Sequence, residues 1–300
     1  MDRMIRCITK SGHLMACAVD STYMVATAQQ IHATSPTATA ALGRLLTGTS
    51  MMGAMLKDKG ATLQIKINGG GPLGNVVAIA DDNGNCRGYV DHPEADLPIR
   101  ADGKLDVGGL VGHDGMVTVM REDKEHAPYT GQVKLLSGEI AEDLATYYAV
   151  SEQIPTVCAL GVLENKENTE QLLAGGLFVQ ALPGVTQEEL NLLEKNASQI
   201  PAVTEMLSQG LSIEDMCSKI LIGMPFEKLD EYPVSYACDC SKERVERAFS
   251  SLKPAEIRTL ADDKSGFAEA RCNYCGRKYR FTSAELNTLA DEVEKSQKNL

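Results

Sequence analysis

Alternation of apolar and polar positions in the first third of the chain predicts a group of β-strands. Leucine and isoleucine alternate with polar residues over 61–68, which is the period of a strand with one buried face. A second strand is predicted over 75–80, and the Asp-Asn-Gly-Asn sequence at 82–85 supplies a turn into a third strand over 86–90. We therefore expect strands joined by short turns in this part of the chain.

Two helices are predicted alongside these strands. Ser35, followed by proline, provides a preferred N-cap and first-turn residue for a helix rich in Ala, Leu and Met over 37–57. Ser137 is expected to open a second helix over 139–151. The mixture of strands and helices predicts an α+β fold that begins with a mixed α/β core domain over 1–179.

Residues 180–231 have a different pattern, because their apolar positions mark short helices in acidic surroundings. Thr186 and Glu189 form a capping box for a first helix, Pro201 begins a second, and Ser212 caps a third. Helices of roughly 8–12 residues are marginal alone, so each must lay an apolar face on a neighbour. We predict a metastable helical linker, although the same pattern also fits helices that belong to one continuous core.

Residues 232–300 are expected to form a small C-terminal domain. Helix signals cover 242–251 and 254–260, and Thr282 and Glu285 form a capping box for a final helix. The domain has few large apolar residues, so its core is thin and a metal ion is physically needed to hold it together. Loss of that ion should unfold the domain.

Composition and charge fit an ordinary soluble protein. Hydrophobic residues make up 43% and charged residues 23% of 300 residues, which suits one large or two modest domains. No stretch approaches the roughly 20 apolar residues of a membrane span, and the N-terminus lacks the apolar region of an export signal, so a cytoplasmic protein is expected. Residues 1–231 carry 17 basic and 30 acidic side chains, and residues 232–300 carry 12 and 11. Neither part has the positive charge expected of a nucleic-acid binder.

Four cysteines in two close pairs are the most specific chemical feature of the chain. Cys238 and Cys240 form a C-x-C pair, and 31 residues separate it from the C-x-x-C pair of Cys272 and Cys275. Four thiolates brought together by a fold make a closed tetrahedral site that suits Zn²⁺ and leaves no position for a catalytic water. Peroxide attacks thiolate sulfur, and zinc leaves when its ligands become disulfides. The pattern predicts a structural zinc site that can also act as a redox switch.

The remaining motifs indicate no catalytic chemistry. Glycines at 69–74 match G-x-G-x-x-G, but a strand follows them, whereas a dinucleotide site needs a helix N-terminus there. The histidines, which show no metal or triad spacing, are at 13, 32, 92, 113 and 126. The basic residues expected to compensate the charge of a zinc tetrathiolate are Arg271, Arg277, Lys278 and Arg280. The other cysteines, expected to be small buried hydrophobic residues, are Cys7, Cys17, Cys86, Cys158 and Cys217.

Several segments together resemble the heat-shock protein 33 family of redox-regulated holdase chaperones, the 33 kDa chaperonins. The cysteine spacing is the most specific part of the resemblance, which spans nearly the whole chain. The other segments are Ser-Pro-Thr-Ala at 35–38, Ala-Leu-Gly-Arg at 41–44, the glycine turn at 69–74 with Asn-Val-Val at 75–77, Arg-Gly-Tyr-Val at 87–90, Ser-Gly-Glu-Ile-Ala at 137–141 and Ser-Glu-Gln at 151–153.

The resemblance implies a protein without enzymatic activity whose chaperone function is controlled by oxidation. In the reduced form one Zn²⁺ per chain is held by the four cysteines and the protein is inactive. Oxidation is expected to form the disulfides Cys238–Cys240 and Cys272–Cys275, release zinc and unfold the C-terminal domain and linker. The active form is then expected to dimerise through the core domain and to bind unfolded or oxidatively damaged client proteins, with no nucleic acid or membrane partner.

Two other classes remain as alternatives. A four-cysteine zinc protein that binds nucleic acid is favoured by the basic and aromatic segment 277–281, and the acidic remainder of the chain argues against it. A thiol-disulfide oxidoreductase would use its C-x-x-C at a helix N-terminus, where the thiol pKa is lowered. The residues after Cys275 instead indicate an extended segment.

Overall fold

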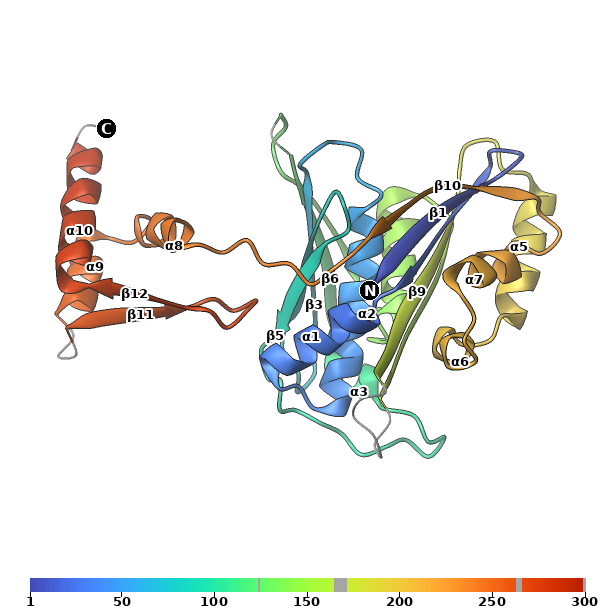
Figure 1. Ribbon diagram of the computed structural model, residues 1–300, viewed down its shortest axis with the longest axis horizontal. Coiled ribbons are helices and arrows are strands. Elements are labelled where there is room, and N and C mark those ends of the chain that lie inside the picture. Colours follow the sequence, from blue (N-terminus) through green and yellow to red (C-terminus); the bar gives the residue numbers. More distant parts are fainter. Residues whose placement is uncertain (124, 165–171, 263–265, 299–300) are drawn as a thin grey trace. The chain divides into compact units, whose positions relative to one another are not determined.

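The described part of the chain forms two compact units of mixed helices and antiparallel strands (Figure 1). The units are Met1–Ala237 and Cys238–Leu300. This mixture confirms the predicted α+β fold class. The computed structural model describes residues 1–123, 125–164, 172–262 and 266–298.

The first sheet of the larger unit has apolar layers on both of its faces. Its strand order is β10-β1-β2-β9-β8, and all neighbouring strands are antiparallel. Alternate residues of the four strands other than β10 enter two different hydrophobic clusters, one on each face. Burial on both faces explains why β9 is almost continuously apolar in sequence. The strands are β1 (Arg3–Thr9), β2 (Leu14–Asp20), β8 (Thr156–Glu164), β9 (Leu172–Ala181) and β10 (Phe226–Pro233).

The second sheet contains the three strands predicted between residues 61 and 90. Its order is β5-β4-β3-β6-β7, again antiparallel throughout. The glycines at 69–74 join β3 to β4, so a strand follows them as expected. The strands are β3 (Thr62–Gly70), β4 (Val76–Asp81), β5 (Cys86–Val90), β6 (Gly112–Glu122) and β7 (Tyr129–Lys134).

Helix α2 (Pro36–Gly53) packs against both sheets and is almost entirely buried (Figure 1). The Ser35 hydroxyl accepts a hydrogen bond from the backbone N–H of Ala38 at 3.2 Å, which confirms the predicted cap. The helix ends before residue 57 because residues 57–60 are exposed and give it no surface to pack on. Two further helices, which the sequence patterns did not indicate, are α1 (Thr22–His32) and α3 (Val107–Val111).

The predicted start of the second helix at Ser137 is wrong. The helix α4 (Ala141–Tyr147) begins later and continues as the π-helix η1 (Tyr148–Glu152). The buried Asp143 carboxylate accepts hydrogen bonds from the backbone N–H groups of Ser137 at 3.1 Å and Ile140 at 3.0 Å. A turn therefore occupies the position expected for the first helical residues, and it holds Ile140 at a φ of 68°.

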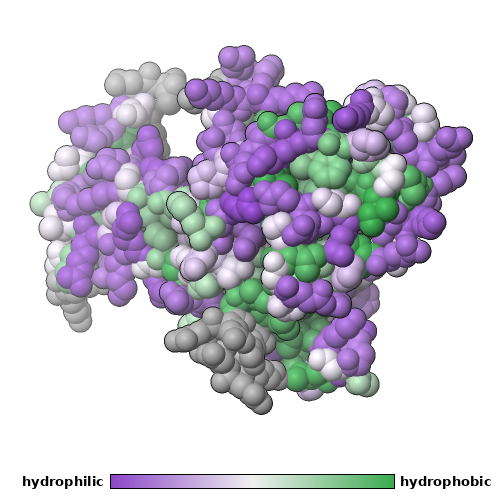
Figure 2. Space-filling view, turned by 45° about the vertical axis from the view of Figure 1, so that its right-hand side comes forward, coloured by the Kyte–Doolittle hydropathy of each residue, from purple (hydrophilic) through white to green (hydrophobic). Residues whose placement is uncertain are grey.

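Three short helices cover the face of the first sheet that is turned away from α2 (Figure 1). They are α5 (Gln187–Gln199), α6 (Val203–Ser208) and α7 (Ile213–Ile220). The predicted capping box at Thr186 is confirmed, and Ser212 caps α7 as expected. Figure 2 is turned toward this side and shows hydrophobic side chains among hydrophilic ones. The side chains of these helices that are buried are Leu193, Asn196, Val203, Met206, Ile213, Met216, Cys217 and Ile220.

The end of the predicted linker is not helical. Residues 226–231 belong to β10, which pairs with β1 at the edge of the first sheet. Most β10 side chains are exposed, so the strand depends on a partner more than 200 residues earlier and has little local signal. The chain as far as Ala237 belongs to the larger unit. The division into 1–179, 180–231 and 232–300 stays a prediction about independent behaviour.

The smaller unit contains three helices and a two-stranded sheet in its described residues. The helices predicted over 242–251 and 254–260 are confirmed, and Glu285 accepts the backbone N–H of Thr282 at 2.8 Å in the predicted capping box. The elements are α8 (Lys242–Phe249), α9 (Pro254–Ala261), β11 (Phe267–Arg271), β12 (Lys278–Thr282) and α10 (Ser283–Lys298).

The core of this smaller unit is thin, as expected. Helix α8 contributes no fully buried side chain, and its Phe249 ring meets Phe281 edge-on at a centroid distance of 5.1 Å. The cluster of buried apolar residues, in the part of the unit that the structure describes, is Ile257, Ala261, Phe281, Leu286, Ala290 and Val293. Such a core leaves the unit dependent on a further constraint.

Asn196→Ala should loosen α5 from α7. The buried Asn196 amide donates hydrogen bonds to the carbonyl oxygens of Ile220 at 3.0 Å and Ile222 at 2.9 Å. Leaving these groups unpaired should cost about 1–3 kcal/mol of local stability. Faster hydrogen exchange in α5 and α7 is the expected result. The matched control is Asn191→Ala on the exposed face of α5, and equal exchange in both variants would contradict the assignment.

Candidate metal centre

The two predicted cysteine pairs are placed by different kinds of local structure. Cys238 and Cys240 lie in the extended segment before α8, and Cys272 and Cys275 lie in the turn between β11 and β12. In that turn the N–H of Gly276 donates to the carbonyl oxygen of Cys272 at 2.9 Å. Gly276 has a φ of 70°, a conformation that glycine adopts without strain. The turn brings both sulfurs of the C-x-x-C pair to one side.

The structure brings the four predicted cysteine ligands together. All four are free thiols whose sulfurs lie within 4.8 Å of one another. The Cys238 and Cys272 sulfurs are 3.7 Å apart, and those of Cys240 and Cys275 are 3.3 Å apart. A tetrahedral ion with metal–sulfur bonds of about 2.3 Å separates its sulfurs by about 3.8 Å. In the described residues this is the one group of three or more His, Cys, Asp or Glu side chains that could hold a metal ion.

Tyr279 is a member of the site that the sequence patterns did not reveal. Its hydroxyl donates to the carbonyl oxygen of Cys240 at 2.8 Å and lies 3.0 Å from the Cys240 sulfur. Burial raises the pKa of the Cys240 thiol, but hydrogen bonds from Tyr279 and the neighbouring cysteines outweigh burial and lower the pKa to about 7. Cys240 therefore has thiolate character near neutral pH.

The other thiols of the centre differ from Cys240 in their protonation. Burial is the main cause of the raised pKa of Cys238, and hydrogen bonds with the other cysteines raise it further. Burial likewise raises the pKa of Cys275. Positive charge from a metal would reverse this preference, because coordinated thiols lose their protons. All four cysteines are only partly buried, so small oxidants can reach the sulfurs.

The basic residues around the second pair have partners of two kinds. Lys278 and Arg280 form ion pairs with Glu269 at 2.7 and 3.3 Å. Arg277 donates to the carbonyl oxygen of Cys240 at 3.4 Å, and its raised pKa reflects its Tyr279 hydrogen bond and the nearby cysteine sulfurs. The expected charge compensation is therefore seen at Arg277. Lys278 and Arg280 pair with Glu269 instead.

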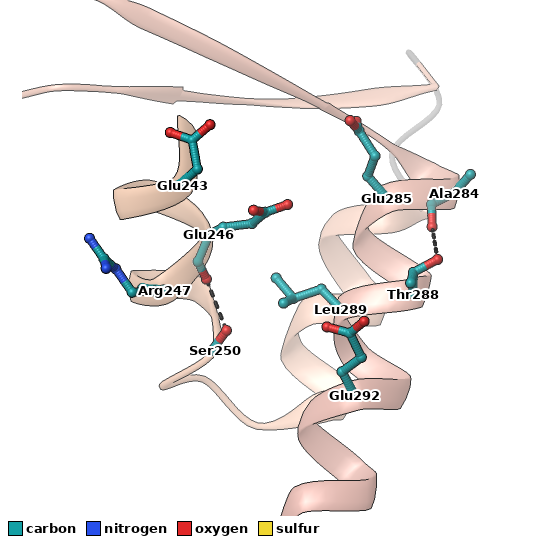
Figure 3. Close-up of a pocket in the computed structure, with 9 residues that line it drawn as sticks. All are labelled: Glu243, Glu246, Arg247, Ser250, Ala284, Glu285, Thr288, Leu289 and Glu292. Atoms are coloured by element: carbon teal, nitrogen blue, oxygen red, sulfur yellow. Dashed lines mark hydrogen bonds between the residues drawn. The ribbon is translucent and has the colours of Figure 1, made fainter. Parts of the chain in front are cut away.

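A pocket with a volume of about 650 Å³ lies between α8 and α10 (Figure 3). Figure 3 shows the Leu289 side chain directed between the two helices, with carboxylates around it. None of its lining residues is a cysteine. The lining residues are Glu243, Glu246, Arg247, Ser250, Ala284, Glu285, Thr288, Leu289 and Glu292. The pocket marks incomplete packing between α8 and α10.

Most of the other cysteines fit the expectation of buried small residues. Cys7, Cys17, Cys86 and Cys217 are buried, whereas Cys158 is half-buried. Burial is the first cause that raises the pKa of Cys17 to about 12. The four paired cysteines are therefore the accessible thiols of the described chain, apart from part of Cys158.

The fold and site define an α+β protein whose smaller unit brings together four cysteines that could hold a metal ion. The family model described as Hsp33 protein matches residues 2–282, and the chain belongs to this family. Family membership and the names of relatives support a chaperone function.

Curated relatives match the chain over nearly its whole length. The 33 kDa chaperonin of Clostridium perfringens is 42% identical over 296 residues, which cover 98% of this chain and 93% of that protein. The 33 kDa chaperonin of Acetivibrio thermocellus is 40% identical and covers 99% of both chains. The crystal structure of the 33 kDa chaperonin of Thermotoga maritima matches with a TM-score of 0.87 and 32% identity, covering 98% of this chain and 99% of that one.

Within residues 1–123, 125–164, 172–262 and 266–298, no helix combines the length and the hydrophobicity needed to cross a bilayer. The longest of the buried helices, α2, owes its apolar composition to packing against two sheets.

Tyr279→Phe should make metal retention more sensitive to acid. The hydrogen bond lowers the pKa of Cys240, so the thiolate is present above about pH 7 and lost as the pH falls. A hydrogen bond to a charged group contributes roughly 1.5–3 kcal/mol. Metal release protonates all four thiolates, so the lost free energy is divided among four protons. The midpoint of metal release should therefore move upward by roughly 0.3–0.5 pH unit.

Metal content measured against pH with a competing chelator checks this expectation. Tyr129→Phe is the control, since it makes the same change on an exposed ring of the larger unit. Equal midpoints for the Tyr279 variant and the unaltered protein would show that the hydroxyl does not stabilise the thiolate.

Proposed function

We propose that the chain is a redox-regulated holdase chaperone whose switch is the cluster of Cys238, Cys240, Cys272 and Cys275. The observation that carries this proposal is the convergence of four accessible thiols in a unit with a thin apolar core. Reduced and metal-bound, the protein is inactive; oxidised, it binds unfolding client proteins and prevents their aggregation. It has no enzymatic activity and acts in the cytoplasm.

Zinc is the metal that fits this proposal, with one ion per reduced chain. Four thiolates make a closed structural site with no open position for a reacting water. A structural zinc contributes roughly 10–16 kcal/mol at neutral pH. The whole stability of a domain is roughly 5–15 kcal/mol, so the smaller unit would not remain folded after losing its ion.

Oxidation converts the four ligands into two disulfides, Cys238–Cys240 and Cys272–Cys275. For each disulfide, one peroxide molecule is reduced to two waters while two thiols lose two electrons and two protons. Cys240 supports this chemistry because it is partly exposed and its pKa is lowered to about 7. Disulfide sulfur is a poor zinc ligand, so the ion leaves and the C-terminal domain unfolds.

The linker, residues 180–231, then supplies the surface that binds clients. Arg3 holds Glu214 of α7 through two hydrogen bonds of 2.7 Å, but these side chains are more than one-third exposed. Such an ion pair contributes about 1 kcal/mol or less. Each buried apolar side chain contributes roughly 1.5–3 kcal/mol, so docking depends mainly on apolar faces. The same faces can bind unfolded chains once α5–α7 leave the sheet.

The partners follow from this mechanism. Clients are unfolded or oxidatively damaged proteins, and the activated protein is a homodimer through its core domain. No nucleic-acid partner is proposed, because two of the basic side chains near the centre already pair with Glu269. An oxidoreductase role is disfavoured because an extended segment and β12 follow Cys275, with no helix N-terminus to activate its thiol.

Cys272→Ser should abolish tight zinc binding. The variant removes one of four ligands, and the remaining three cannot close the tetrahedral site. Zinc stoichiometry should fall from one per chain to nearly zero under a chelator that the unaltered protein resists. Cys158→Ala is the control because it removes a thiol of the larger unit. Unchanged zinc affinity in Cys272→Ser would contradict the ligand assignment.

Peroxide with mild heat should convert the protein from inactive to active in suppressing client aggregation. Zinc content, free thiols and light scattering of a heat-labile client are measured on one sample before and after treatment. Zinc should be released and scattering should fall only after oxidation. Equally strong suppression of client aggregation before oxidation would contradict the proposed redox switch. Turnover of a disulfide substrate, or salt-dependent binding of nucleic acid with no suppression, would favour one of the alternatives.

The two disulfides should form in order, Cys272–Cys275 before Cys238–Cys240. A C-x-x-C ring closes with ordinary turn geometry, whereas the C-x-C ring spans one residue and is strained, which raises its reduction potential. Thiol trapping and peptide mapping during a peroxide time course measure the order. Chains with Cys238–Cys240 closed and the other pair free would refute it. The mapping must also distinguish cross-pair bonds, because the 3.3 Å sulfur contact joins Cys240 to Cys275.

A further inference from the structure

Two cysteines that are far apart in sequence meet at the contact between the first sheet and α7. Cys7 lies in β1 and Cys217 in α7, and their exposed fractions are 1% and 0%. Both belong to the hydrophobic cluster between the sheet and the linker helices. The two thiols are hydrogen-bonded to each other. This contact therefore joins the core domain to the linker through a pair of sulfurs.

The two thiols of this pair differ in pKa. The hydrogen bond with Cys217 is the main cause of the lowered pKa of Cys7. The same hydrogen bond, followed by burial, raises the pKa of Cys217. Cys7 therefore loses its proton more readily than Cys217 and is the first of the two to react with peroxide.

Cys17 provides a comparison within the same sheet. It is equally buried but belongs to the cluster on the opposite face, with Met4 and Val19. Burial is the first cause that raises its pKa to about 12, so it stays a protonated thiol. The close approach of two sulfurs at Cys7 and Cys217 is therefore not a general property of the buried cysteines of this protein.

We propose that Cys7 and Cys217 are a second redox-active pair, separate from the metal centre, and that peroxide oxidises them to a disulfide that fastens α7 to β1. This disulfide acts as a brake on activation, because it holds the linker on the sheet. The brake rests on the proposed function, in which the linker must leave the sheet. Formation of the disulfide itself does not depend on that function.

The oxidation balances with peroxide as the single oxidant. The Cys7 thiolate attacks one peroxide oxygen, the O–O bond breaks, and the departing hydroxide takes a proton to become water. The Cys217 sulfur then displaces hydroxide from the sulfenic acid on Cys7, and its thiol proton completes a second water. Two thiols become one disulfide, and one peroxide becomes two waters.

Burial places this reaction in competition with the metal centre. Peroxide reaches Cys7 and Cys217 only during brief openings of α7, whereas the four cysteines of the centre are partly exposed. Chains whose linker leaves first carry the two sulfurs apart and cannot close the bond. Chains that close the bond first keep α7 docked. The proportion of cross-linked chains therefore limits how much of the protein becomes active.

Peptide mapping tests the disulfide directly. Reduced, zinc-loaded, full-length protein is treated with peroxide below the temperature at which the linker unfolds, blocked with an alkylating reagent and digested with trypsin without reduction. Cleavage after Arg and Lys leaves Cys7 in peptide 7–10 and Cys217 in peptide 196–219, each with a single cysteine. The expected product is these two peptides joined.

The variants make the assignment specific. The joined peptides should be absent from Cys7→Ala and Cys217→Ala and retained in Cys17→Ala, which shortens an equally buried side chain on the other face. Recovery of Cys7 and Cys217 as alkylated single peptides from the unaltered protein, after the centre is fully oxidised, overturns the proposal. The unaltered protein alone decides this point, so a variant that fails to fold does not weaken the test.

Hydrogen exchange then tests the brake. Cross-linked protein should exchange the amides of α7 at least tenfold more slowly than protein that is oxidised at the centre but not cross-linked. Equal exchange in the two fractions would refute the brake even if the disulfide forms. If no form of the protein suppresses aggregation, the proposed function fails, while the mapped disulfide still decides whether the pair is redox-active.

Discussion

We propose that the smaller unit depends on one constraint, the convergence of four sulfurs that could share a metal ion. Its described residues bury only six apolar side chains as a cluster, and α8 buries none completely. The segment with Cys238 and Cys240 has no strand or helix to hold it against the β11–β12 turn. Bonds from a common ion to both cysteine pairs would supply what the core lacks. The same four sulfurs would therefore both stabilise the fold of this unit and be the atoms that are oxidised.

The proposed weakness of the linker has a different cause. Helices α5–α7 are too short to be stable alone and gain stability by covering one face of the first sheet. Their polar anchors, such as His13 with Glu189 at 2.9 Å, are partly exposed and contribute little. In the proposed mechanism, this apolar contact is both the main stabilising interaction of the linker and the surface hidden from clients. The pair Cys7 and Cys217 lies within this contact, where a single covalent bond would have the greatest effect on release.

Local rules account for the elements that could be predicted, and long-range contacts account for those that could not. The boxes at Thr186 and Thr282 and the spacing of the cysteine pairs depend on residues close in sequence, so they could be read directly. The turn at Ser137 depends on the carboxylate of Asp143, and β10 depends on pairing with β1. Tyr279 reaches Cys240 only after the β11–β12 hairpin has formed. Sequence periodicity does not predict such long-range contacts.

Hydrogen exchange after removal of the metal tests the central claim most directly. The zinc-loaded protein is compared with protein stripped by a chelator under reducing conditions, which separates loss of the ion from oxidation. The account predicts that protection of β11, β12 and α10 collapses first, that protection of α5–α7 falls with it or after it, and that β3 and β6 in the second sheet remain protected. Full protection of residues 238–298 in the metal-free protein would contradict the account, because the four sulfurs would then not be what holds that unit together.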